Sequence, residues 1–510
     1  MGRGTLNTPG IKNLATQSSL NGTIKAICDI MRRSNCAGAL QYVPELTWIL
    51  FLRILDEREE HEAERAEAVG DSFRPSLQAP YCWRDWAAPD GKKRRELQDG
   101  TLGAFFSFVN DDLIPHLRVL KDRVDATPRQ KVISEVFSGM TRTRIDTEKN
   151  LLDVLDKVHE ISQEDVDTTH IFTLSQVYEG LLLKMGERGN DGGQFFTPRE
   201  VTRAIVRVVD PKIGESVYDP GCGTGGFLAQ SFEHMAGPDN GRIKSPDQLE
   251  TLRQHTFFGR EKDNAIYPIA LANLILHGID EPHLWHGNTL TSSETYGGLF
   301  TDAPALYDVI MMNPPFGGKE GQAAQTNFAF KTSATQVLFL QHVIDSLKPG
   351  GRCGIVLDEG VLFRTNETAF VQTKRKLLDD CDLWCIVSLP PGVFTAAGAG
   401  VKTNLLFFNK SGPTKKVWYY DLSAIKVTKK NPLTLKHFEE FFKLAPKRAD
   451  GPQSWTVTRK EIEARNFDLK AVNSNAKSTE DTRIPEELLD LIEAKGKELV
   501  EAVKSLRASL

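Results

Sequence analysis

Apolar positions in the first third of the chain recur with the spacing of helices. They lie three or four residues apart at Leu20, Ile24 and Ile27. Between Glu45 and Ala68 an apolar half at helical spacing runs into a half rich in Glu and Arg. Further helical patterns cover residues 101–108, 130–137 and 151–158, and an interval with prolines and the KKRR cluster at 92–95 predicts a loop among them. We therefore expect a helical N-terminal domain over residues 1–165.

After Thr169 the pattern changes to short β-rich runs that alternate with helical segments. The runs are residues 216–218, 256–259, 308–312, 352–357, 385–389 and 404–408, and the clearest helices between them are 263–277 and 336–347. Such alternation is typical of a mostly parallel α/β sheet with helices on both faces. We assign this Rossmann-like α/β domain to residues 166–412.

Beyond Lys410 the chain becomes polar and rich in lysine, and it ends in an amphipathic segment. From Pro485 to Leu506 the apolar residues share one helical stripe, formed by Leu488, Leu491, Ile492, Leu499, Val503 and Leu506. We expect a partly helical C-terminal region over residues 413–510. Its terminal helix packs either on the rest of the chain or on a partner.

Composition is that of an ordinary soluble globular protein, since 40% of the 510 residues are hydrophobic and 26% are charged. No apolar run reaches the roughly 20 residues that span a bilayer, and residues 1–10 have no apolar core that could serve as a signal peptide. We therefore expect a cytoplasmic protein without membrane contact. The net charge of −5 argues against binding nucleic acid through bulk positive charge, so such binding needs a local groove or a basic partner.

A glycine-rich bend follows the first strand of the α/β domain, in SVYDPGCGTGGF at residues 216–227. Gly221, Gly223 and Gly226 fit the dinucleotide fingerprint, which alone is a weak signal. Two acids favour a different ligand, because Asp219 directly before the bend can bind an ammonium group and Glu261 near the end of the next strand can bind two ribose hydroxyls. A cationic ligand with a ribose is S-adenosylmethionine, which we favour over NAD.

A second polar bend follows the strand in DVIMMNPPFGG, residues 308–318, at the carboxyl edge where open α/β sheets bind ligands. The Asn313 side-chain oxygen and the Pro314 carbonyl can each accept one N–H bond from an exocyclic amine. That pair favours a tetrahedral nitrogen whose lone pair is directed at the methyl group. Pro314 and Pro315 fix φ, and Phe316 offers a stacking face to a flipped base. The competing interpretation is a Pro-Pro turn with one core phenylalanine.

A helix start precedes the glycine bend, in GGQFFTPREVTRAIV at residues 192–206. Thr197 is a good N-cap, Pro198 suits the first helical position, and Glu200 completes a T-x-x-E capping box. One interpretation is simply a well-capped helix. The other is that Phe195, Phe196 and the helix N-terminus hold the carboxylate end of the cofactor.

Two sequence patterns that the chain lacks limit the kinds of reaction it can catalyse. The seven cysteines lack the spacing of zinc ligands, so we expect reduced thiols and no metal site. The chain also has no Pro-Cys dipeptide, which argues against attack by a thiolate on a cytosine ring carbon. We expect a direct in-line methyl transfer without a covalent enzyme intermediate.

In chain order, QFFTPREV, DPGCGTGGF, the acid of GREKD, GNTL at 287–290 and NPPF resemble the amino-methyltransferases of the γ arrangement. The segments LKPGGRCGIVLDEGVLF at 347–363 and LPPGVFTAAGAGVKTNLLFF at 389–408 are similar to the modification subunit of type I restriction–modification systems. The helical segment around residues 46–57 is similar to that family's N-terminal domain. The resemblance covers roughly residues 20–409.

The resemblance implies a class I S-adenosylmethionine-dependent methyltransferase that acts on N6 of adenine in double-stranded DNA. By position, it implies that Asn313, Pro314, Pro315 and Phe316 hold the target base, and that the cofactor is bound by Gln194, Phe195, Phe196, Thr197, Pro198, Arg199, Asp219, Gly221, Gly223, Thr224, Gly225, Gly226, Glu261 and Asn288. Two positions depart from the family. Asn288 stands where many relatives have Asp near the adenine moiety, and Asp358 stands where relatives usually have Pro.

The resemblance also implies partners. In this family a separate specificity subunit reads the DNA, two modification subunits flank one specificity subunit, and a restriction subunit can join. This chain has no long insertion after NPPF that could read DNA by itself, and its terminal helix would pack on the specificity subunit. The net charge of −5 then predicts weak DNA binding by the chain alone.

Two further interpretations stay open. One is methylation of a different amine, such as guanine N2 in ribosomal RNA or a protein glutamine, because NPPF-like bends serve those reactions too. The other is a DNA-binding scaffold without catalytic activity. The intact acids Asp219 and Glu261, together with Asn313, argue against the scaffold.

Overall fold

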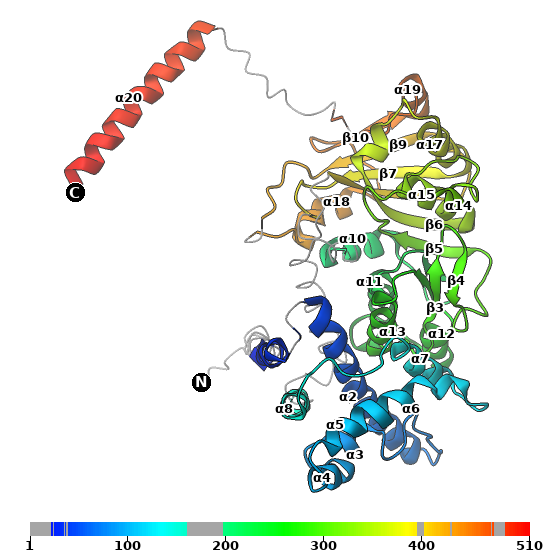
Figure 1. Ribbon diagram of the computed structural model, residues 1–510. Coiled ribbons are helices and arrows are strands. Elements are labelled where there is room, and N and C mark those ends of the chain that lie inside the picture. Colours follow the sequence, from blue (N-terminus) through cyan, green and yellow to red (C-terminus); the bar gives the residue numbers. More distant parts are fainter. Residues whose placement is uncertain are drawn as a thin grey trace, which may run out of the picture.

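A computed structural model describes residues 22–23, 25–34, 36, 39–160, 197–394, 402–428, 431–470, 472–473 and 485–509. Within this part of the chain, N-terminal helices lie against one side of a ten-stranded sheet, and a C-terminal helix stands apart (Figure 1). None of the helices in these ranges combines the length and the hydrophobicity that crossing a membrane requires.

The N-terminal region is helical, as predicted. Its longest element is α2 (Ala39–Ala68), and the shorter ones are α3 (Trp83–Trp86), α4 (Lys92–Gln98), α5 (Ala104–Ser107), η1 (Phe108–Leu113), α6 (Ile114–Arg118), η2 (Leu120–Asp122), α7 (Pro128–Val136) and α8 (Glu148–His159). Three buried tryptophans pack together in the core of this region. Trp86 stacks on Trp48 at 6.4 Å between ring centroids and meets Trp83 edge-on at 5.8 Å.

The KKRR cluster is helical, so the predicted loop at residues 92–95 is wrong. It forms the start of α4, and Arg94 is 4% exposed. Its guanidinium donates to the carbonyl of Ala87 at 2.6 Å and pairs with Asp156 at 2.6 Å. A buried arginine with two fixed partners therefore connects α4 to α8.

The central sheet has the order β10-β9-β7-β8-β6-β5-β1-β2-β3-β4. Strands β3, β2, β1, β5 and β6 are parallel, and β8 is antiparallel to both β6 and β7. All six predicted strands are present, as β1 (Val217–Asp219), β2 (Phe257–Glu261), β5 (Tyr307–Met312), β6 (Leu347–Asp358), β7 (Asp382–Ser388) and β8 (Thr403–Asn409). The predicted Rossmann-like α/β class is therefore confirmed.

Four strands lie outside the predicted set, namely β3 (His283–Asn288), β4 (Ser293–Tyr296), β9 (Lys416–Asp421) and β10 (Ser454–Thr458). The last two extend the same sheet beyond residue 412, so the predicted boundary falls between two strands of one sheet. Only four residues of β9 are buried, and lysines precede them. An apolar run this short, in a lysine-rich segment, is too weak a pattern to predict a strand.

Helices cover both faces of the sheet, because the side chains of its strands alternate between two cores. In β5, Val309 and Met311 join the core with α10 (Arg199–Val209), α11 (Gly226–Ala236) and α13 (Ile266–Leu276). Ile310 and Met312 join the core with α15 (Thr335–Ser346) and α17 (Thr368–Asp380). The remaining elements are α12 (Pro246–Gln254), η4 (Pro238–Asn240), α14 (Gln322–Gln325), α16 (Glu359–Phe363), η5 (Leu435–Phe438), α18 (Glu439–Leu444) and α19 (Arg459–Ala464).

The N-terminal helices meet the sheet domain at α13, which contacts both α2 and α7 (Figure 1). Asp280, just after α13, accepts hydrogen bonds from Arg58 of α2 and from Arg129 of α7, the latter at 3.2 Å. The contact therefore combines apolar packing with a cluster of ion pairs.

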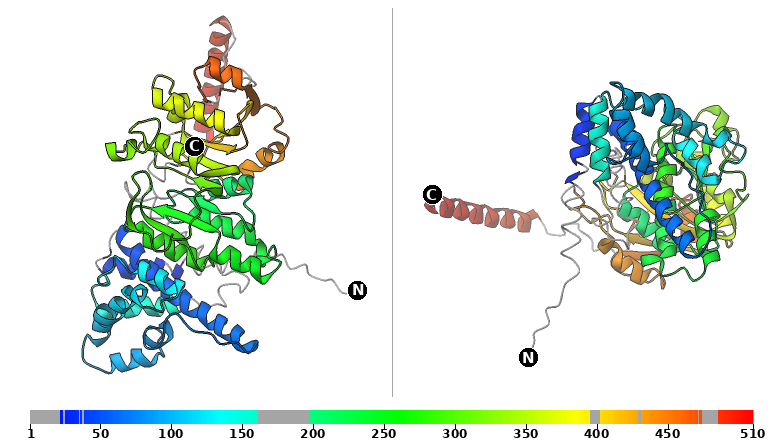
Figure 2. Two further views of the ribbon diagram at one scale, coloured as in Figure 1. Left: turned by 90° about the vertical axis from the view of Figure 1, so that its right-hand side faces the viewer. Right: turned by 90° about the horizontal axis from the view of Figure 1, so that it is seen from below.

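The predicted terminal helix is present as α20 (Pro485–Ser509) and stands away from the sheet (Figure 2). It carries exposed apolar side chains at Leu489, Leu499, Val500 and Val503, of which Leu499 is 67% exposed. An exposed row of this kind is typical of a docking surface.

Candidate cofactor and target-base site

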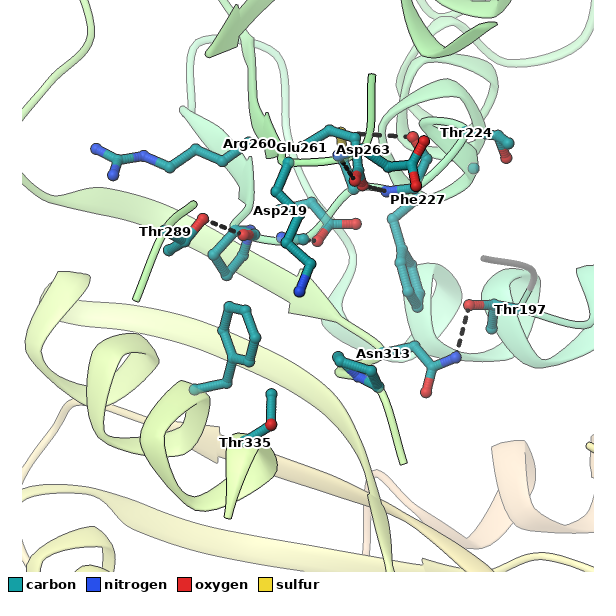
Figure 3. Close-up of a pocket in the computed structure, with 18 of the residues that line it drawn as sticks. Thr197, Asp219, Thr224, Phe227, Arg260, Glu261, Asp263, Thr289, Asn313 and Thr335 are labelled. Atoms are coloured by element: carbon teal, nitrogen blue, oxygen red, sulfur yellow. Dashed lines mark hydrogen bonds between the residues drawn. The ribbon is translucent and has the colours of Figure 1, made fainter. Parts of the chain in front are cut away.

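A cavity of about 410 Å³ lies at the carboxyl edge of the sheet (Figure 3). The strand order reverses between β1 and β5, so their connections leave in opposite directions and open a crevice there. Of the predicted site residues, the ones that line the cavity are Thr197, Arg199, Asp219, Gly221, Gly223, Thr224, Gly226, Glu261, Asn288, Asn313 and Pro315. The fold thus brings together segments that are far apart in the sequence.

The remaining predicted residues do not line the cavity or cannot be placed. Pro198, Gly225, Pro314 and Phe316 lie next to lining residues without lining it themselves. Gln194, Phe195 and Phe196 lie outside the described residues, so their predicted contacts with the cofactor stay predictions.

The glycine bend between β1 and α11 needs residues without side chains. Gly223 and Gly225 have φ of +53° and +81°, which residues with a Cβ rarely adopt. A Cβ on Gly221 would lie 2.9 Å from the end of the Met312 side chain. The bend can therefore stay close to the neighbouring strand β5 and leave space at the cavity.

Two buried carboxyl groups face this space. Asp219, 1% exposed, accepts a hydrogen bond from the Gly221 N–H at 3.1 Å. Glu261, 6% exposed, accepts from the N–H groups of Gly223 at 2.9 Å and Asp263 at 2.8 Å. Neither forms an ion pair with a cation of the described chain.

Burial raises the pKa of both groups, since a carboxylate loses its hydration in the protein interior. The pKa of Asp219 rises to about 8, because desolvation and the nearby Glu261 outweigh the hydrogen bond from Gly221. The pKa of Glu261 rises to about 7, because desolvation outweighs its backbone hydrogen bonds. Two buried carboxyl groups with raised pKa values in one cavity indicate a site for a cation or for hydroxyl donors.

Asn288 ends β3 at the same edge. Its side-chain oxygen accepts a hydrogen bond from the Leu290 N–H at 3.0 Å, and the next residue, Thr289, donates to the Pro220 carbonyl at 2.6 Å. The asparagine therefore lines the cavity while it also shapes its own turn.

Asn313 directly follows β5, and its side-chain amide is held at the nitrogen end. The amide nitrogen donates to the hydroxyl of Thr197 at 3.1 Å (Figure 3). The amide oxygen is buried, and no donor of the described residues reaches it. An acceptor buried without a donor costs about 1–3 kcal/mol, so the site is built for a ligand that supplies an N–H or O–H.

The rest of the bend is held from two sides. The Pro314 carbonyl accepts a 3.5 Å hydrogen bond from the buried side chain of Gln336 in α15. The other end of Gln336 accepts from the N–H of Asp358 at 3.4 Å. Phe316 packs edge-on against Phe394, with ring centroids 5.2 Å apart.

The predicted capping box at Thr197 is wrong. Helix α10 begins at Arg199, and Pro198 takes the N-cap position with an extended ψ of 129°. The Thr197 hydroxyl instead accepts from Asn313, and the Glu200 carboxylate accepts from the Leu435 N–H at 3.1 Å. Both polar side chains therefore serve partners distant in the sequence, which a local motif cannot reveal.

Sequence reasoning missed Asn273, which lines the cavity from the middle of α13. Its amide nitrogen donates to the Thr224 carbonyl at 2.8 Å, and its own oxygen is buried without a hydrogen bond in the described residues. A signal was available, because Asn273 is the single amide in the otherwise apolar stretch IYPIALANLIL. A buried polar residue in such a helix indicates a structural or ligand-binding role.

Comparison with known families agrees with this geometry. The N-6 DNA Methylase family matches residues 169–483, and the HsdM N-terminal domain matches residues 20–158. The methylase subunit of the type I restriction enzyme EcoEI from Escherichia coli is 36% identical over 96% of this chain and 97% of its own length. The methylase subunit of the EcoKI enzyme from Escherichia coli K12 is 29% identical over 86% of this chain and 79% of its own length.

Solved structures give the same result. A chain of a type I restriction–modification system, studied for complex assembly and conformational transition, is 38% identical with a TM-score of 0.73, over 96% of this chain and 97% of that one. The modification subunit assigned to a type I restriction enzyme of Vibrio vulnificus YJ016 is 32% identical with a TM-score of 0.75, over 93% of this chain and 99% of that one.

Proposed function

The chain belongs to the N-6 DNA methylase family and, within it, to the methylase subunits of type I restriction enzymes, and from that premise we propose how it acts. It is the modification subunit of a type I restriction–modification complex. It transfers a methyl group to N6 of an adenine that has been flipped out of double-stranded DNA.

The observation that carries the proposal is the buried oxygen of Asn313, which accepts no hydrogen bond from the described residues. An exocyclic amine has two N–H groups, and its lone pair is delocalised into the ring. Hydrogen bonds to the Asn313 oxygen and the Pro314 carbonyl would draw both N–H groups out of the ring plane. The lone pair then localises on nitrogen and can attack a methyl group in line.

We propose S-adenosylmethionine as the methyl donor. The two buried carboxyl groups fit it, because Asp219 can bind its ammonium group and Glu261 its ribose hydroxyls. Both carry raised pKa values, and neither pairs with a cation of the described residues. Its sulfonium supplies an activated methyl group. No nucleophile of the chain is needed, since the target nitrogen itself attacks.

The other lining residues receive roles by position. Arg199 and the glycine bend 221–226 border the part of the cavity assigned to the methionine end, and Asn288 borders the part assigned to the adenine moiety. Phe316, which lies next to the lining residue Pro315, is the proposed stacking partner for the flipped base. Its edge-on contact with Phe394 fixes the ring before the base arrives.

The proposed assembly has two copies of this chain on one specificity subunit, with a restriction subunit as a further partner. The relatives are methylase subunits of type I restriction enzymes, and one related chain was solved in a study of type I complex assembly. The net charge of −5 supports this assembly, because a negatively charged chain binds DNA weakly by itself. Sequence recognition and most of the DNA affinity then belong to the specificity subunit.

Co-expression of this chain with the specificity gene of its own locus, followed by mapping of methylated bases in the host DNA, tests the proposal. We expect N6-methyladenine at one recurring sequence motif. Asn313→Ala should abolish transfer while S-adenosylmethionine still binds in calorimetry. Unmodified adenine in the wild-type pair, or methyl groups on RNA or protein instead, would contradict the proposed function.

A further inference from the structure

Thr197 and Asn313 lie 116 residues apart in the chain and meet at the cavity. We propose that Thr197 is a positioning residue, which holds the Asn313 amide with its oxygen directed at the target amine. This inference rests on the proposed function, because it assigns a role within the methyl-transfer site.

The hydrogen-bond pattern supports one orientation of the amide. The Asn313 nitrogen lies 3.1 Å from the Thr197 hydroxyl oxygen and donates to it. Figure 3 shows the amide oxygen turned away from Thr197. The oxygen is the buried atom for which the described residues supply no donor, so it is the atom that remains for a ligand.

The orientation matters because the two ends of an amide have nearly the same shape and opposite hydrogen-bonding character. With the oxygen toward the target, the amide accepts an N–H of the exocyclic amine. With the nitrogen toward the target, two sets of N–H groups would face each other. The amine would then lose one of the two acceptors that localise its lone pair.

Thr197 can hold the amide because it directly precedes the N-cap residue of a packed helix. Pro198 occupies the N-cap of α10, and its carbonyl accepts from the N–H groups of Val201 and Thr202. Helix α10 packs closely on β6, since a Cβ on Gly354 would lie 2.6 Å from the side chain of Ile205. The hydroxyl, which performs no capping, is therefore presented to Asn313 from a rigid element.

The competing role is a direct contact with the cofactor, because Thr197 also lines the cavity. The two roles predict different measurements. A positioning residue affects the rate of methyl transfer at saturating cofactor and DNA. A cofactor contact affects the dissociation constant of S-adenosylmethionine, and saturation with the cofactor restores the rate.

The experiment uses the full chain assembled with its specificity subunit and compares Thr197→Val, Thr197→Ala and Thr197→Ser. Valine keeps the shape of threonine without the acceptor, alanine removes the hydroxyl without adding bulk, and serine keeps the hydroxyl. Single-turnover methylation of a duplex with the recognition sequence gives the rate, and calorimetry with S-adenosylmethionine gives the affinity.

We expect the rate to fall roughly 10- to 100-fold in the valine and alanine variants, the range that misplacement of a reacting group produces. Their dissociation constants should stay within about threefold of wild type, a change of about 0.7 kcal/mol or less. The serine variant should keep most of the wild-type rate. Retained cofactor binding shows that each variant is folded.

Three results would overturn the inference: a wild-type rate in either hydroxyl-free variant, a rate loss that saturating cofactor reverses, or loss of cofactor binding in both variants. Failure of the proposed function looks different. In that case the wild-type complex itself methylates no adenine, whereas an active wild type with an equally active Thr197→Val removes only the positioning role.

Discussion

Asn273, in the middle of α13, donates a hydrogen bond from its side-chain nitrogen to the carbonyl oxygen of Thr224 at 2.8 Å. Helix α13 also packs against α2 and α7 of the N-terminal region. One helix therefore contacts the N-terminal helices on one side and holds the glycine bend of the cavity on the other. A movement of the N-terminal helices that shifts α13 would therefore also shift its hydrogen bond to the glycine bend of the proposed cofactor site.

Asn273→Asp should weaken S-adenosylmethionine binding, because a carboxylate has no N–H for the Thr224 carbonyl and repels it. Loss of a buried hydrogen bond costs about 1–3 kcal/mol, which corresponds to roughly 5- to 150-fold in the dissociation constant. Calorimetry with the full chain measures the change. Asn466→Asp is the matched control, since Asn466 also donates to a backbone carbonyl, that of Thr365 at 2.8 Å, but lies away from the cavity.

An unchanged dissociation constant in Asn273→Asp would mean that the glycine bend holds its conformation without this bond. A similar loss in Asn466→Asp would mean that the effect reports general destabilisation.

Much of the site was predictable because parallel strands place their carboxyl ends at one edge. Asp219, Glu261 and Asn313 were each predicted as residues at or just after the end of a strand, and all three line one cavity. That inference needs only strand positions and the topology of α/β folds. The exact pairing of strands is not required, so errors of one or two residues in the strand bounds do no harm.

The contacts between distant segments were not predictable. The sequence around Thr197 satisfies a local capping motif, but its hydroxyl bonds to Asn313 instead. Asn273 carries no motif, and its role depends on which loop packs against α13. Arg94 was predicted in a loop, because its charge hides the fact that the side chain is buried between α4 and α8. Each of these depends on tertiary packing, which local patterns do not encode.

Asp219→Asn should raise the melting temperature of the cofactor-free protein. The pKa of Asp219 is raised from 3.8 to about 8 in the fold, so the folded state holds the proton more tightly than the unfolded state. Ionisation therefore opposes folding increasingly as pH rises from about 4 to about 8. The neutral amide keeps the acceptor for the Gly221 N–H and removes that cost, so the gain should be larger at pH 8 than at pH 6.

The same variant should lose affinity for S-adenosylmethionine, because the amide cannot pair with an ammonium group. Asp308→Asn is the control, in which the melting temperature should change in the opposite direction. Burial raises the pKa of Asp308, but hydrogen bonds from Lys348 and Ser216 lower it more, so its ionised form stabilises the fold. That control should lower the melting temperature and leave cofactor binding intact. A fall in stability for Asp219→Asn would contradict the assigned cause of the raised pKa.

Asp280→Asn should destabilise the contact between the N-terminal helices and the sheet domain. Asp280 is the acid shared by Arg58, Arg129 and Arg253, and Arg253 already has a pKa lowered by burial and by the charge of Arg58. Glu59 and Glu62 still pair with Arg58 and Arg129, so without Asp280 the three arginines keep one positive charge that no acid of the cluster compensates. We expect a loss of about 2 kcal/mol, between the values typical of exposed and buried ion pairs.

Thermal and urea unfolding of the full chain measure that loss. Adding Arg253→Ala to Asp280→Asn should recover part of it, because one of the repelling charges is gone. Asp125→Asn is the control, since its 2.7 Å ion pair with Arg74 is exposed and should leave stability unchanged. If Arg253→Ala makes the double variant less stable still, packing rather than charge dominates the contact.

Leu499→Glu with Val503→Glu should prevent assembly with the specificity subunit without unfolding the chain. Leu499 and Val503 lie one helical turn apart on α20, are 67% and 42% exposed, and form part of its apolar row. Burying two carboxylates in an interface is costly, so binding should fall by at least about 100-fold. Size-exclusion chromatography and calorimetry with the purified specificity subunit measure assembly.

The control for α20 is Lys497→Ala with Lys504→Ala. It changes the net charge by the same two units, since removing two lysines and adding two glutamates both make the chain more negative by two. Residues 497 and 504 point roughly 100–160° away from Leu499 and Val503 around the helix axis, because each residue turns about 100°. Assembly should therefore survive in the control, whereas equal loss in both variants would show that charge, not the apolar row, governs docking.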